Sequence, residues 1–422
     1  MKKLAAIIFL AFVLRVVLSL LAEHGDVINY YWWAKDLATN GLEGFYERNI
    51  ANAVRPTYPP ITSYLFFLTA SVHKLLFRFI WFLNIRISIF PSDFVHWWES
   101  EKGWYFINKF PAIVADIFIV YFLYYFVSGL SDKKKGLIAA AVFAFIPPFW
   151  YNSSLWGQTD SLFALPLLGS FIALQKKRKI LAIFLFVLSV LTKPTALFVF
   201  LPFFLWWFQK INIKSLLLSV IVVFWEIYLL YFPFHPQGTT AWIFDFYRKS
   251  LGGELNYMVA NSFNFWGLIY GFDNKVDTTL LFGLTSRFVG YLIFAFFGVI
   301  LFWVFLKVKK KTTPFYLLLS VLFSFAAFMF LPRMHERYFY PTLLFMVPLM
   351  AIEKETRKAF WVGAFIHLIN LYHFWWVPKI ELFITLFKNV ISEKAIIILN
   401  IALFFWFLKY FWKKYAPPSQ IS

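Results

Sequence analysis

The sequence predicts an all-α membrane protein, a polytopic bundle of about twelve transmembrane helices that forms a single unit over residues 1–422. Three observations lead to this fold class. Hydrophobic residues make up 61% of the chain and charged residues only 14%, a composition unlike that of soluble domains. Apolar runs of membrane-spanning length recur from end to end. The basic residues lie in short clusters between those runs, so the net charge of +19 reports membrane topology and indicates no nucleic-acid partner.

The basic clusters set the topology, because short loops rich in Lys and Arg stay in the cytoplasm. Of the 21 acidic residues only Asp132, Glu353 and Glu355 lie in the basic loops, and Asp116 and Glu226 lie inside apolar runs. We therefore expect a multi-pass protein of the cell membrane with both termini inside and its functional site on the outer face. The basic clusters lie at residues 2–3, 133–135, 176–179, 210–214, 307–311, 354–358 and 413–414.

The first span covers about residues 4–22 and is expected to be an uncleaved anchor, since Arg15 interrupts it and no small-residue cleavage site follows. A cleaved signal peptide is the alternative. Residues 23–105 then form one long outer loop. Its apolar segment at 61–82 contains a histidine, a lysine and an arginine, and is expected to lie on the outer leaflet as an interfacial helix. A true span is the alternative, but it would break the charge rule.

The remaining spans follow from the same criteria of apolarity and charge. Lys193 and Pro194 separate two short spans, because proline breaks a helix. A second outer loop runs over about residues 233–278, and no internal repeat is evident. The predicted spans lie at about 106–129, 137–152, 160–175, 180–192, 195–208, 215–232, 279–306, 314–331, 339–352, 359–377 and 395–412.

Polar segments collect at the outer ends of these spans. They are HGDVINYYWWAKDLA (24–38), VRPTYPP (54–60), NKFP (108–111), WGQTDS (156–161), NSFNFWG (261–267) and PRMHERYFYP (332–341). Polar and charged side chains are costly beside lipid, so we expect the six segments to face a shared outward cavity.

Each polar residue also has a plainer interpretation. Arg333 and Arg337 are compatible with side chains that only snorkel to lipid headgroups. Asp160 is compatible with a helix cap. Lys109 and Asp116 lie seven residues apart on one helical face, which favours structural pairing with another helix. Ordinary turn or helix-end positions are the corresponding interpretations of His335, Glu336, Asn261 and Lys193.

Asp26 follows the first span directly, and His24 lies two residues before it. Apolar and aromatic neighbours would bury the carboxylate partly and hold it where a lipid-linked substrate meets water. A carboxylate in that place can act as a general base. A solvated acid after a helix is the alternative.

Seven short motifs follow one another along nearly the whole chain. They are GDVINYYWWAKDLATNGLEGFYE (25–47), TYPP (57–60), KFPAIVADI (109–117), WGQTDS (156–161), LTKP (191–194), NSFNFWG (261–267) and PRMHERYFYP (332–341). With them the chain resembles the GT-C superfamily of integral-membrane glycosyltransferases, which use lipid-phosphate-linked sugars. Within it, the resemblance is to the prokaryotic mannosyltransferase-like group related to the second mannosyltransferase of GPI-anchor assembly.

The resemblance implies a GT-C type fold whose long first outer loop carries helices lying on the membrane. It also implies a catalytic aspartate in that loop, here Asp26. Many relatives have a second acidic residue or an Asp-x-Asp pair there. This chain has no such pair, and Glu43 and Glu47 lie further along. The missing pair argues against a metal site in this loop, so a divalent metal is possible but not required, and no other cofactor is expected.

A sugar on polyprenyl or dolichyl phosphate would leave a lipid phosphate, so the site has to stabilise growing negative charge. Arginines suit phosphate through forked hydrogen bonds. Asp26 would take the proton of the acceptor hydroxyl in a single displacement that inverts the anomeric carbon. Trp32, Trp33, Tyr58, Trp156 and Trp266 would stack sugars or line the groove for the lipid tail. The candidate catalytic residues are Asp26, Asp160, His335 and Glu336, and the candidate substrate-binding residues are His24, Arg55, Tyr58, Lys109, Trp156, Gln158, Lys193, Asn261, Arg333 and Arg337.

The expected function is an inverting glycosyltransferase that moves a hexose, mannose being favoured by the resemblance, to a glycan or glycolipid acceptor. A polytopic transporter or lipid flippase is the first alternative, and it can claim Asp116, Glu226 and the break at Lys193–Pro194. A polysaccharide polymerase or ligase that uses diphosphate-linked donors is another. A non-catalytic scaffold of the same fold is the last.

Overall fold

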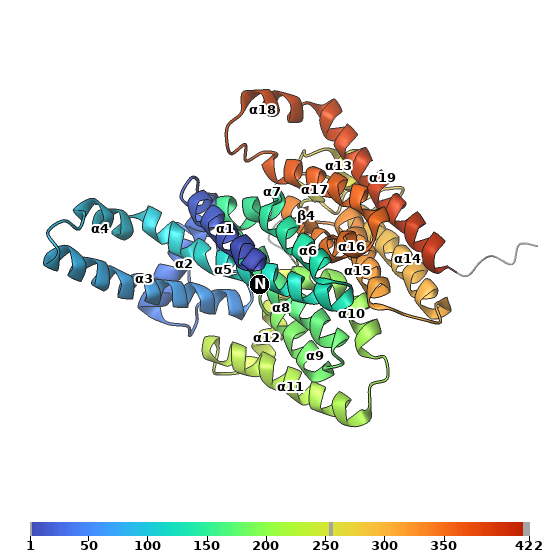
Figure 1. The fold of residues 1–422 in the computed structure, drawn as a ribbon, viewed down its shortest axis with the longest axis horizontal. Coiled ribbons are helices and arrows are strands. Elements are labelled where there is room, and N and C mark those ends of the chain that lie inside the picture. The colour runs from blue at the N-terminus through green and yellow to red at the C-terminus, as the bar shows by residue number, and fades with distance from the viewer. Residues whose placement is uncertain (1, 253–255, 417–422) are drawn as a thin grey trace, which may run out of the picture. The chain divides into compact units, whose positions relative to one another are not determined.

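The computed structural model describes residues 2–252 and 256–416, and helices account for most of them (Figure 1). The chain divides into two compact units. The first unit holds Met1–Phe122, Phe149–Ala196 and Ile211–Gly252, and the second holds Leu123–Pro148, Leu197–Lys210 and Gly253–Ser422. The only sheets among the described residues are two pairs of two-residue strands, so the predicted all-α class is confirmed.

The first unit contains the first predicted outer loop and the beginning of the second, up to Gly252. Its helices are α1 (Lys2–Ser19), α2 (Gly25–Asn40), α3 (Pro60–Arg86), α4 (Ser92–Glu99), most of α5 (Glu101–Leu130), the π-helix η1 (Tyr151–Trp156), α8 (Asp160–Gln175), α9 (Lys179–Val190), α11 (Ile213–Tyr231), η3 (Phe232–Phe234) and α12 (Thr239–Gly252). Helix α7 (Pro147–Trp150) and the 3₁₀ helix η2 (Pro194–Val199) each begin in one unit and end in the other.

The second unit holds the C-terminal helices and the short strands. Its elements are α6 (Lys133–Phe145), α10 (Phe200–Trp207), β1 (Val259–Ala260), α13 (Phe265–Tyr270), β2 (Leu280–Leu281), β3 (Leu284–Thr285), α14 (Ser286–Lys307), α15 (Thr313–Phe330), β4 (Met334–His335), η4 (Glu336–Phe339), α16 (Tyr340–Ile352), η5 (Lys354–Thr356), α17 (Arg357–Tyr372), α18 (Glu381–Phe387) and α19 (Val390–Tyr415). Strand β1 pairs in parallel with β4, and β2 pairs antiparallel with β3.

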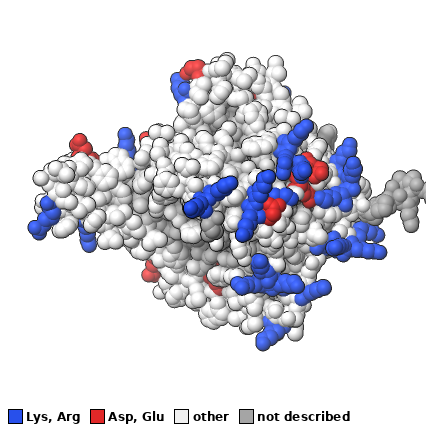
Figure 2. Space-filling model, viewed as in Figure 1, with Lys and Arg blue, Asp and Glu red and all other residues white. Residues whose placement is uncertain are grey.

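Six helices in the described part of the chain are long and apolar enough to cross a membrane. They are Pro60–Arg86, Glu101–Leu130, Ile213–Phe234, Ser286–Lys307, Thr313–Phe330 and Val390–Tyr415. The pair Lys133–Phe145 and Pro147–Trp156, bent by 49°, makes a seventh if it counts as one span. Much of the surface visible in Figure 2 carries no charged side chain, as lipid contact requires. Membrane character is thus supported by helix length and composition.

The predicted twelve spans exceed what helix length alone supports. Apolar helices do occupy 160–175, 180–192 and 195–208, but they contain only 10–17 residues each. At a rise of about 1.5 Å per residue, twelve residues cover about 18 Å, less than the roughly 30 Å of a hydrocarbon core. The predicted break at Lys193–Pro194 is confirmed, since α9 ends at Val190 and a 3₁₀ helix begins at Pro194.

Several predicted span limits were wrong for local reasons. The span at 279–306 begins only at Ser286, because residues 280–285 form the β2–β3 hairpin. The span at 137–152 is broken after Phe145, where Ile146 is extended before Pro147. The span at 359–377 ends at Tyr372. The segment at 61–82 is one continuous helix, Pro60–Arg86, and it belongs to the six that could cross a membrane.

An aromatic core fixes α2 within the first unit. The buried residues of α2 recur at helical spacing, as Val27, Tyr30, Trp33, Ala34 and Leu37. They pack against α3, where the ring of Phe66 stacks on Tyr30 at 4.7 Å between centroids. The start of α2, which carries Asp26, is therefore held on a rigid support.

The core of the second unit is centred on α15 and α16. Every residue of α15 from Phe315 to Phe330 is buried, and so is every residue of α16 from Tyr340 to Ala351. A helix that is apolar on all sides belongs in an interior. Helices α14, α17 and α19 pack around this pair.

Candidate active site

Asp26 lies in the first turn of α2, where the helix dipole favours a carboxylate. His24 is the N-cap residue, and its Nδ1 atom accepts a hydrogen bond from the Asp26 backbone N–H at 3.1 Å. The same Nδ1 lies 3.1 Å from Oδ2 of Asp26. The Asp26 side chain remains 28% exposed. Sequence position alone suggested a carboxylate near the surface, and the structure adds a histidine that accepts from the Asp26 amide and lies beside its carboxylate.

Two side chains from the WGQTDS motif donate hydrogen bonds to Asp26. Nε1 of Trp156 lies 3.2 Å from Oδ2, and Nε2 of Gln158 donates to the same oxygen. The other amide atom of Gln158, Oε1, is buried and has no hydrogen-bond partner among the described residues. A flipped amide would set Oε1 against the carboxylate, so the charge on Asp26 fixes the orientation of Gln158.

The segment that presents Trp156 and Gln158 has an unusual backbone. Residues Tyr151–Trp156 form a π-helix, a conformation frequent at functional sites. Gly157 ends it at a φ of +90°, and the amides of Gly157 and Gln158 both donate to the carbonyl oxygen of Asn152. A Cβ atom at Gly157 would lie 2.3 Å from Cγ2 of Val27. Glycine is needed here for both backbone angle and space.

Lys109 was predicted to bind substrate, but the structure gives it a different place. The side chain is fully buried, and its ammonium donates to the carbonyl oxygens of Ser19 at 3.0 Å, Ala22 at 2.5 Å and Leu155 at 3.1 Å. It therefore joins α5 to the end of α1 and to η1. This contact agrees with the structural alternative for Lys109.

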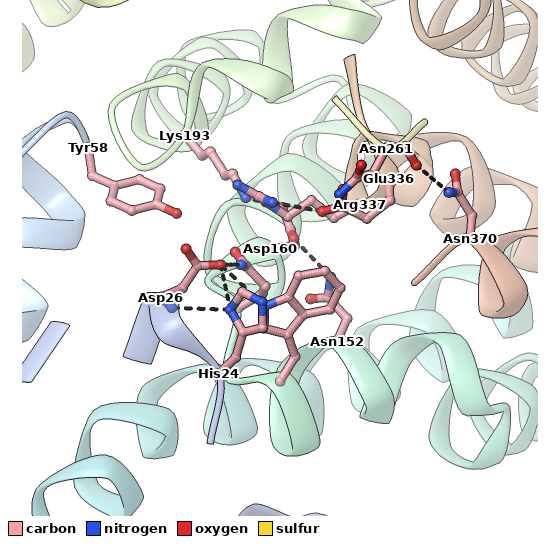
Figure 3. Close-up of polar contacts among 12 residues, drawn as sticks. His24, Asp26, Tyr58, Asn152, Asp160, Lys193, Asn261, Glu336, Arg337 and Asn370 are labelled. Atoms are coloured by element: carbon pink, nitrogen blue, oxygen red, sulfur yellow. Dashed lines mark hydrogen bonds and ion pairs between the residues drawn. The ribbon is translucent and has the colours of Figure 1, made fainter. Parts of the chain in front are cut away.

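Asp160 forms a buried ion pair. Its Oδ1 lies 2.5 Å from Nζ of Lys193, and its Oδ2 accepts a hydrogen bond of 3.0 Å from Nδ2 of Asn152 (Figure 3). Asp160 is the first residue of α8 and the N-cap position belongs to Thr159, so the capping interpretation was wrong. Nζ of Lys193 lies 5.9 Å from the ring centre of Tyr58, within cation–π range.

Asp116 anchors a second buried network that sequence reasoning did not assemble. Its Oδ2 accepts from Nε of Arg15 and from Oγ of Ser153, each at 2.6 Å, and its Oδ1 accepts from Oγ of Ser161 at 2.5 Å. Both charged side chains are fully buried. The predicted pairing of Asp116 with another helix is confirmed, and its partner is the arginine that interrupts the first apolar run. The position of Arg15 inside that apolar run was the one sequence signal that it needed a buried acidic partner.

The loop at 54–60 is tied to α2 by its polar atoms. Nε1 of Trp33 donates to the Val54 carbonyl oxygen at 2.8 Å, and the hydroxyls of Tyr30 and Tyr58 lie 3.1 Å apart. Arg55 is exposed, and its Nε donates to the carbonyl oxygen of Tyr46. Burial raises the pKa of the Tyr46 phenol well above its usual range, so the phenol stays protonated and donates to the Tyr58 carbonyl oxygen.

Five predicted site residues lie in the second unit. Parallel pairing of β1 with β4 brings Asn261 beside His335, and Nδ2 of Asn370 donates to the Asn261 carbonyl oxygen at 2.6 Å. Each arginine has a carboxylate partner, Arg333 with Asp277 at 2.8 Å and Arg337 with the adjacent Glu336 at 2.8 Å (Figure 3 shows the latter pair). Both arginines therefore form ion pairs within the protein, which the interpretation of side chains that only reach lipid headgroups did not include.

The structure thus groups the predicted residues within each unit. In the first unit four of the six predicted polar segments meet. Asp26 binds Trp156, Trp33 binds Val54, and the side chain of Lys109 lies beside Gly157. In the second unit the segments 261–267 and 332–341 meet through the β1–β4 pair. Among the residues described, no cluster of three or more His, Asp or Glu could hold a metal ion.

No model of a protein family matches the chain, and no curated protein matches it significantly. The likeness to GT-C enzymes therefore rests on the motifs alone. The geometry around Asp26 carries the functional argument, because its carboxylate is fixed by two neutral donors from the WGQTDS motif and stays 28% exposed.

Proposed function

We propose that this chain is an inverting glycosyltransferase of GT-C type. It moves a hexose from a polyprenyl- or dolichyl-phosphate donor to a glycan or glycolipid acceptor at the outer face of the membrane. The observation that carries the proposal is the setting of Asp26. Its carboxylate accepts hydrogen bonds from Trp156 and Gln158, lies beside His24 and remains partly open to solvent.

The chemistry follows from that setting. The acceptor hydroxyl oxygen attacks the anomeric carbon, and Asp26 takes its proton. The bond between that carbon and the phosphate oxygen breaks, the lipid phosphate leaves with the electron pair, and the carbon is inverted. Donors aimed at one oxygen of Asp26 keep the carboxylate oriented for the transfer. His24 positions Asp26, because its Nδ1 accepts the Asp26 backbone N–H.

The leaving phosphate needs positive charge. In the first unit Arg55 is the exposed candidate, whereas Lys193 is buried against Asp160 and is better suited to positioning. The half-buried ring of Tyr58 is the sugar-stacking candidate of this unit, whereas Trp156 is buried against His24 and is better suited to positioning Asp26. Sequence position still proposes Arg333 and Arg337 for phosphate and His335 and Glu336 for acid–base help. A divalent metal remains compatible with the proposal but is not needed for a monophosphate leaving group.

The proposal includes a finer topology. The chain has about twelve spans with both termini in the cytoplasm. Helices too short to cross the bilayer alone, such as α9, continue into irregular segments that are buried in the protein, and together they cover the membrane thickness. Helix α3 lies along the outer leaflet, as in the first loop of GT-C enzymes. The charge pattern and the resemblance support this arrangement, and the length of α3 is the argument against it.

A transporter or flippase is the second candidate, favoured by one observation. Glu226 lies in α11, only 7% exposed, and neither carboxyl oxygen has a hydrogen-bond partner within the described residues. An ionisable side chain inside a membrane helix is often part of a transport pathway.

The test is transfer by the purified, reconstituted protein. Radiolabelled mannose, glucose and galactose on polyprenyl phosphate serve as donors, and a membrane extract supplies acceptors. Asp26→Asn is compared with wild type and with Asp93→Asn. Asp93 is the matched control, because it is an exposed aspartate in the first turn of α4 in the same unit.

We expect label transfer by wild type and Asp93→Asn, and a loss of about 10²–10⁴-fold in Asp26→Asn. Equal transfer by all three proteins would leave a glycosyltransferase but remove Asp26 as its base. Absence of transfer from every donor, together with movement of lipid or solute across the same vesicles that Glu226→Gln abolishes, would replace the enzyme by a transporter.

A further inference from the structure

The β2–β3 hairpin of the second unit exposes an apolar tip. Leu280 is 68% exposed, Phe282 95% and Leu284 44%. The turn is tight, because Phe282 and Gly283 both adopt positive φ angles of +51° and +80°. No charged residue lies between Thr278 and Ser286. An aromatic ring almost fully exposed at the end of an uncharged turn is unfavourable in water and calls for a partner.

The base of the hairpin is rigid, so the tip has a fixed position in its unit. Asp277 is buried and pairs with Arg333. The backbone N–H of Ser286 donates to the Thr279 carbonyl oxygen at 2.8 Å, and the amide of Arg287 donates to the Asp277 carbonyl oxygen at 3.0 Å. These bonds connect the hairpin directly to the first turn of α14.

The length and charge of α14 place the hairpin at one membrane boundary. The helix has 22 residues and ends at Lys307, where the basic run to residue 311 marks the cytoplasmic side. Twenty-two residues span about 33 Å, close to the roughly 30 Å of a hydrocarbon core. The N-terminal end of α14 therefore reaches the outer boundary, and the hairpin lies at that level.

The surface that continues from the hairpin is itself lipid-facing. Phe288, Tyr291 and Leu292, in the first two turns of α14, are all about half exposed. The most apolar window of this helix is only 22% buried inside the protein. The apolar tip is thus continuous with a helix face that needs lipid around it.

We propose that the β2–β3 hairpin inserts its tip, Leu280 and Phe282, into the outer interface of the bilayer and anchors the second unit there. Large apolar side chains at this depth lie at the boundary between headgroups and acyl chains. The partner is the lipid bilayer itself. The inference does not depend on the proposed transferase activity.

The chain contains no cysteine, so a single introduced thiol can report the depth of the tip without further engineering. The environment-sensitive fluorophore NBD is attached to Phe282→Cys, to Leu280→Cys, which keeps Phe282, and to Lys275→Cys. Lys275 is the control, because it is exposed and lies in the same connection, ahead of the hairpin. The full-length proteins are reconstituted in phosphatidylcholine vesicles with and without brominated acyl chains.

We expect blue-shifted emission and strong quenching by brominated lipid at positions 280 and 282, and emission typical of water with little quenching at 275. Equal emission and quenching at all three positions would overturn the proposal. Blue-shifted emission at 280 and 282 without quenching by brominated lipid would also overturn it, since a second copy of the chain or another protein would then cover the tip.

Discussion

Asp26 and Asp116 are carboxylates of the same unit with opposite settings. Asp116 is fully buried and bound by Arg15, Ser153 and Ser161, so its charge is already neutralised. Asp26 is 28% exposed, and the side chains of Trp156 and Gln158 that bind it carry no charge. A carboxylate locked to an arginine supports the fold, whereas one oriented by neutral donors and open to solvent remains available for proton transfer.

Arg15→Met tests the buried carboxylate of this comparison, Asp116, and should have the largest effect. It leaves the Asp116 charge buried without its cation, and loss of one partner of a buried pair costs about 3–5 kcal/mol. We expect a large drop in the thermal unfolding temperature in detergent micelles, followed by tryptophan fluorescence. The double variant Arg15→Met/Asp116→Leu should recover most of the loss, because no charge is then left buried. A single variant as stable as wild type would show that the pair is not structural.

Gly157→Ala tests the backbone that carries Trp156 and Gln158 to Asp26. The substitution adds strain at a φ of +90° and a contact of 2.3 Å with Val27, so we expect a loss of about 1–3 kcal/mol in unfolding free energy. Val27→Ala is the control background, because it removes Cγ2 of Val27 and leaves the φ of Gly157 unchanged. The cost of Gly157→Ala should be smaller in the Val27→Ala background than in wild type, and the difference isolates the contact from the strain. An equal cost in both backgrounds would mean that the contact with Val27 relaxes freely.

Sequence patterns predicted the positions of most helices and several of the contacts at the site. The charge rule placed residues 24–38, 54–60, 108–111 and 156–161 on one side of the membrane, and in the first unit they meet. The lone Lys193–Pro194 pair marked a helix break correctly, because proline acts locally. The charge rule and the proline break depend only on composition and on residues adjacent in the sequence, so both can be read without the structure.

Partners far apart in sequence could not be predicted in the same way. Arg15 and Asp116 are 101 residues apart, and nothing in either local pattern selects the other. Lys109 binds three backbone carbonyl oxygens, and backbone groups leave no mark in composition. The hairpin at 280–285 was absorbed into a predicted span because its residues are as apolar as the helix. Gly283 was the one available signal that the helix had not yet begun.

Trp156→Phe tests the partly exposed carboxylate of the comparison, Asp26. It keeps the aromatic ring but removes the Nε1 donor to Asp26, and a hydrogen bond to a charged group is worth about 1.5–3 kcal/mol. We expect transfer activity to fall roughly 10- to 100-fold with little change in thermal stability. Trp242→Phe is the control, since its Nε1 also donates to a carboxylate, Glu47, on the surface of the same unit. Equal activities of the two variants would indicate that orientation of Asp26 by Trp156 is unimportant.

The smallest effect is expected at Asp132, a fully solvated carboxylate of the second unit. It caps α6 by accepting the Lys135 N–H at 2.9 Å, and this hydrogen bond lowers the pKa of its carboxyl group. A lowered folded-state pKa gives stability that is present above the unfolded pKa of about 3.9 and is lost as pH falls through the folded value. Asn caps as well as Asp but does not titrate, so Asp132→Asn should lose slightly less thermal stability than wild type between pH 6 and pH 3. The other carboxyl groups titrate equally in both proteins and cancel in that difference. A larger loss in the variant would mean that the carboxylate at Asp132 does not stabilise the folded state through its charge.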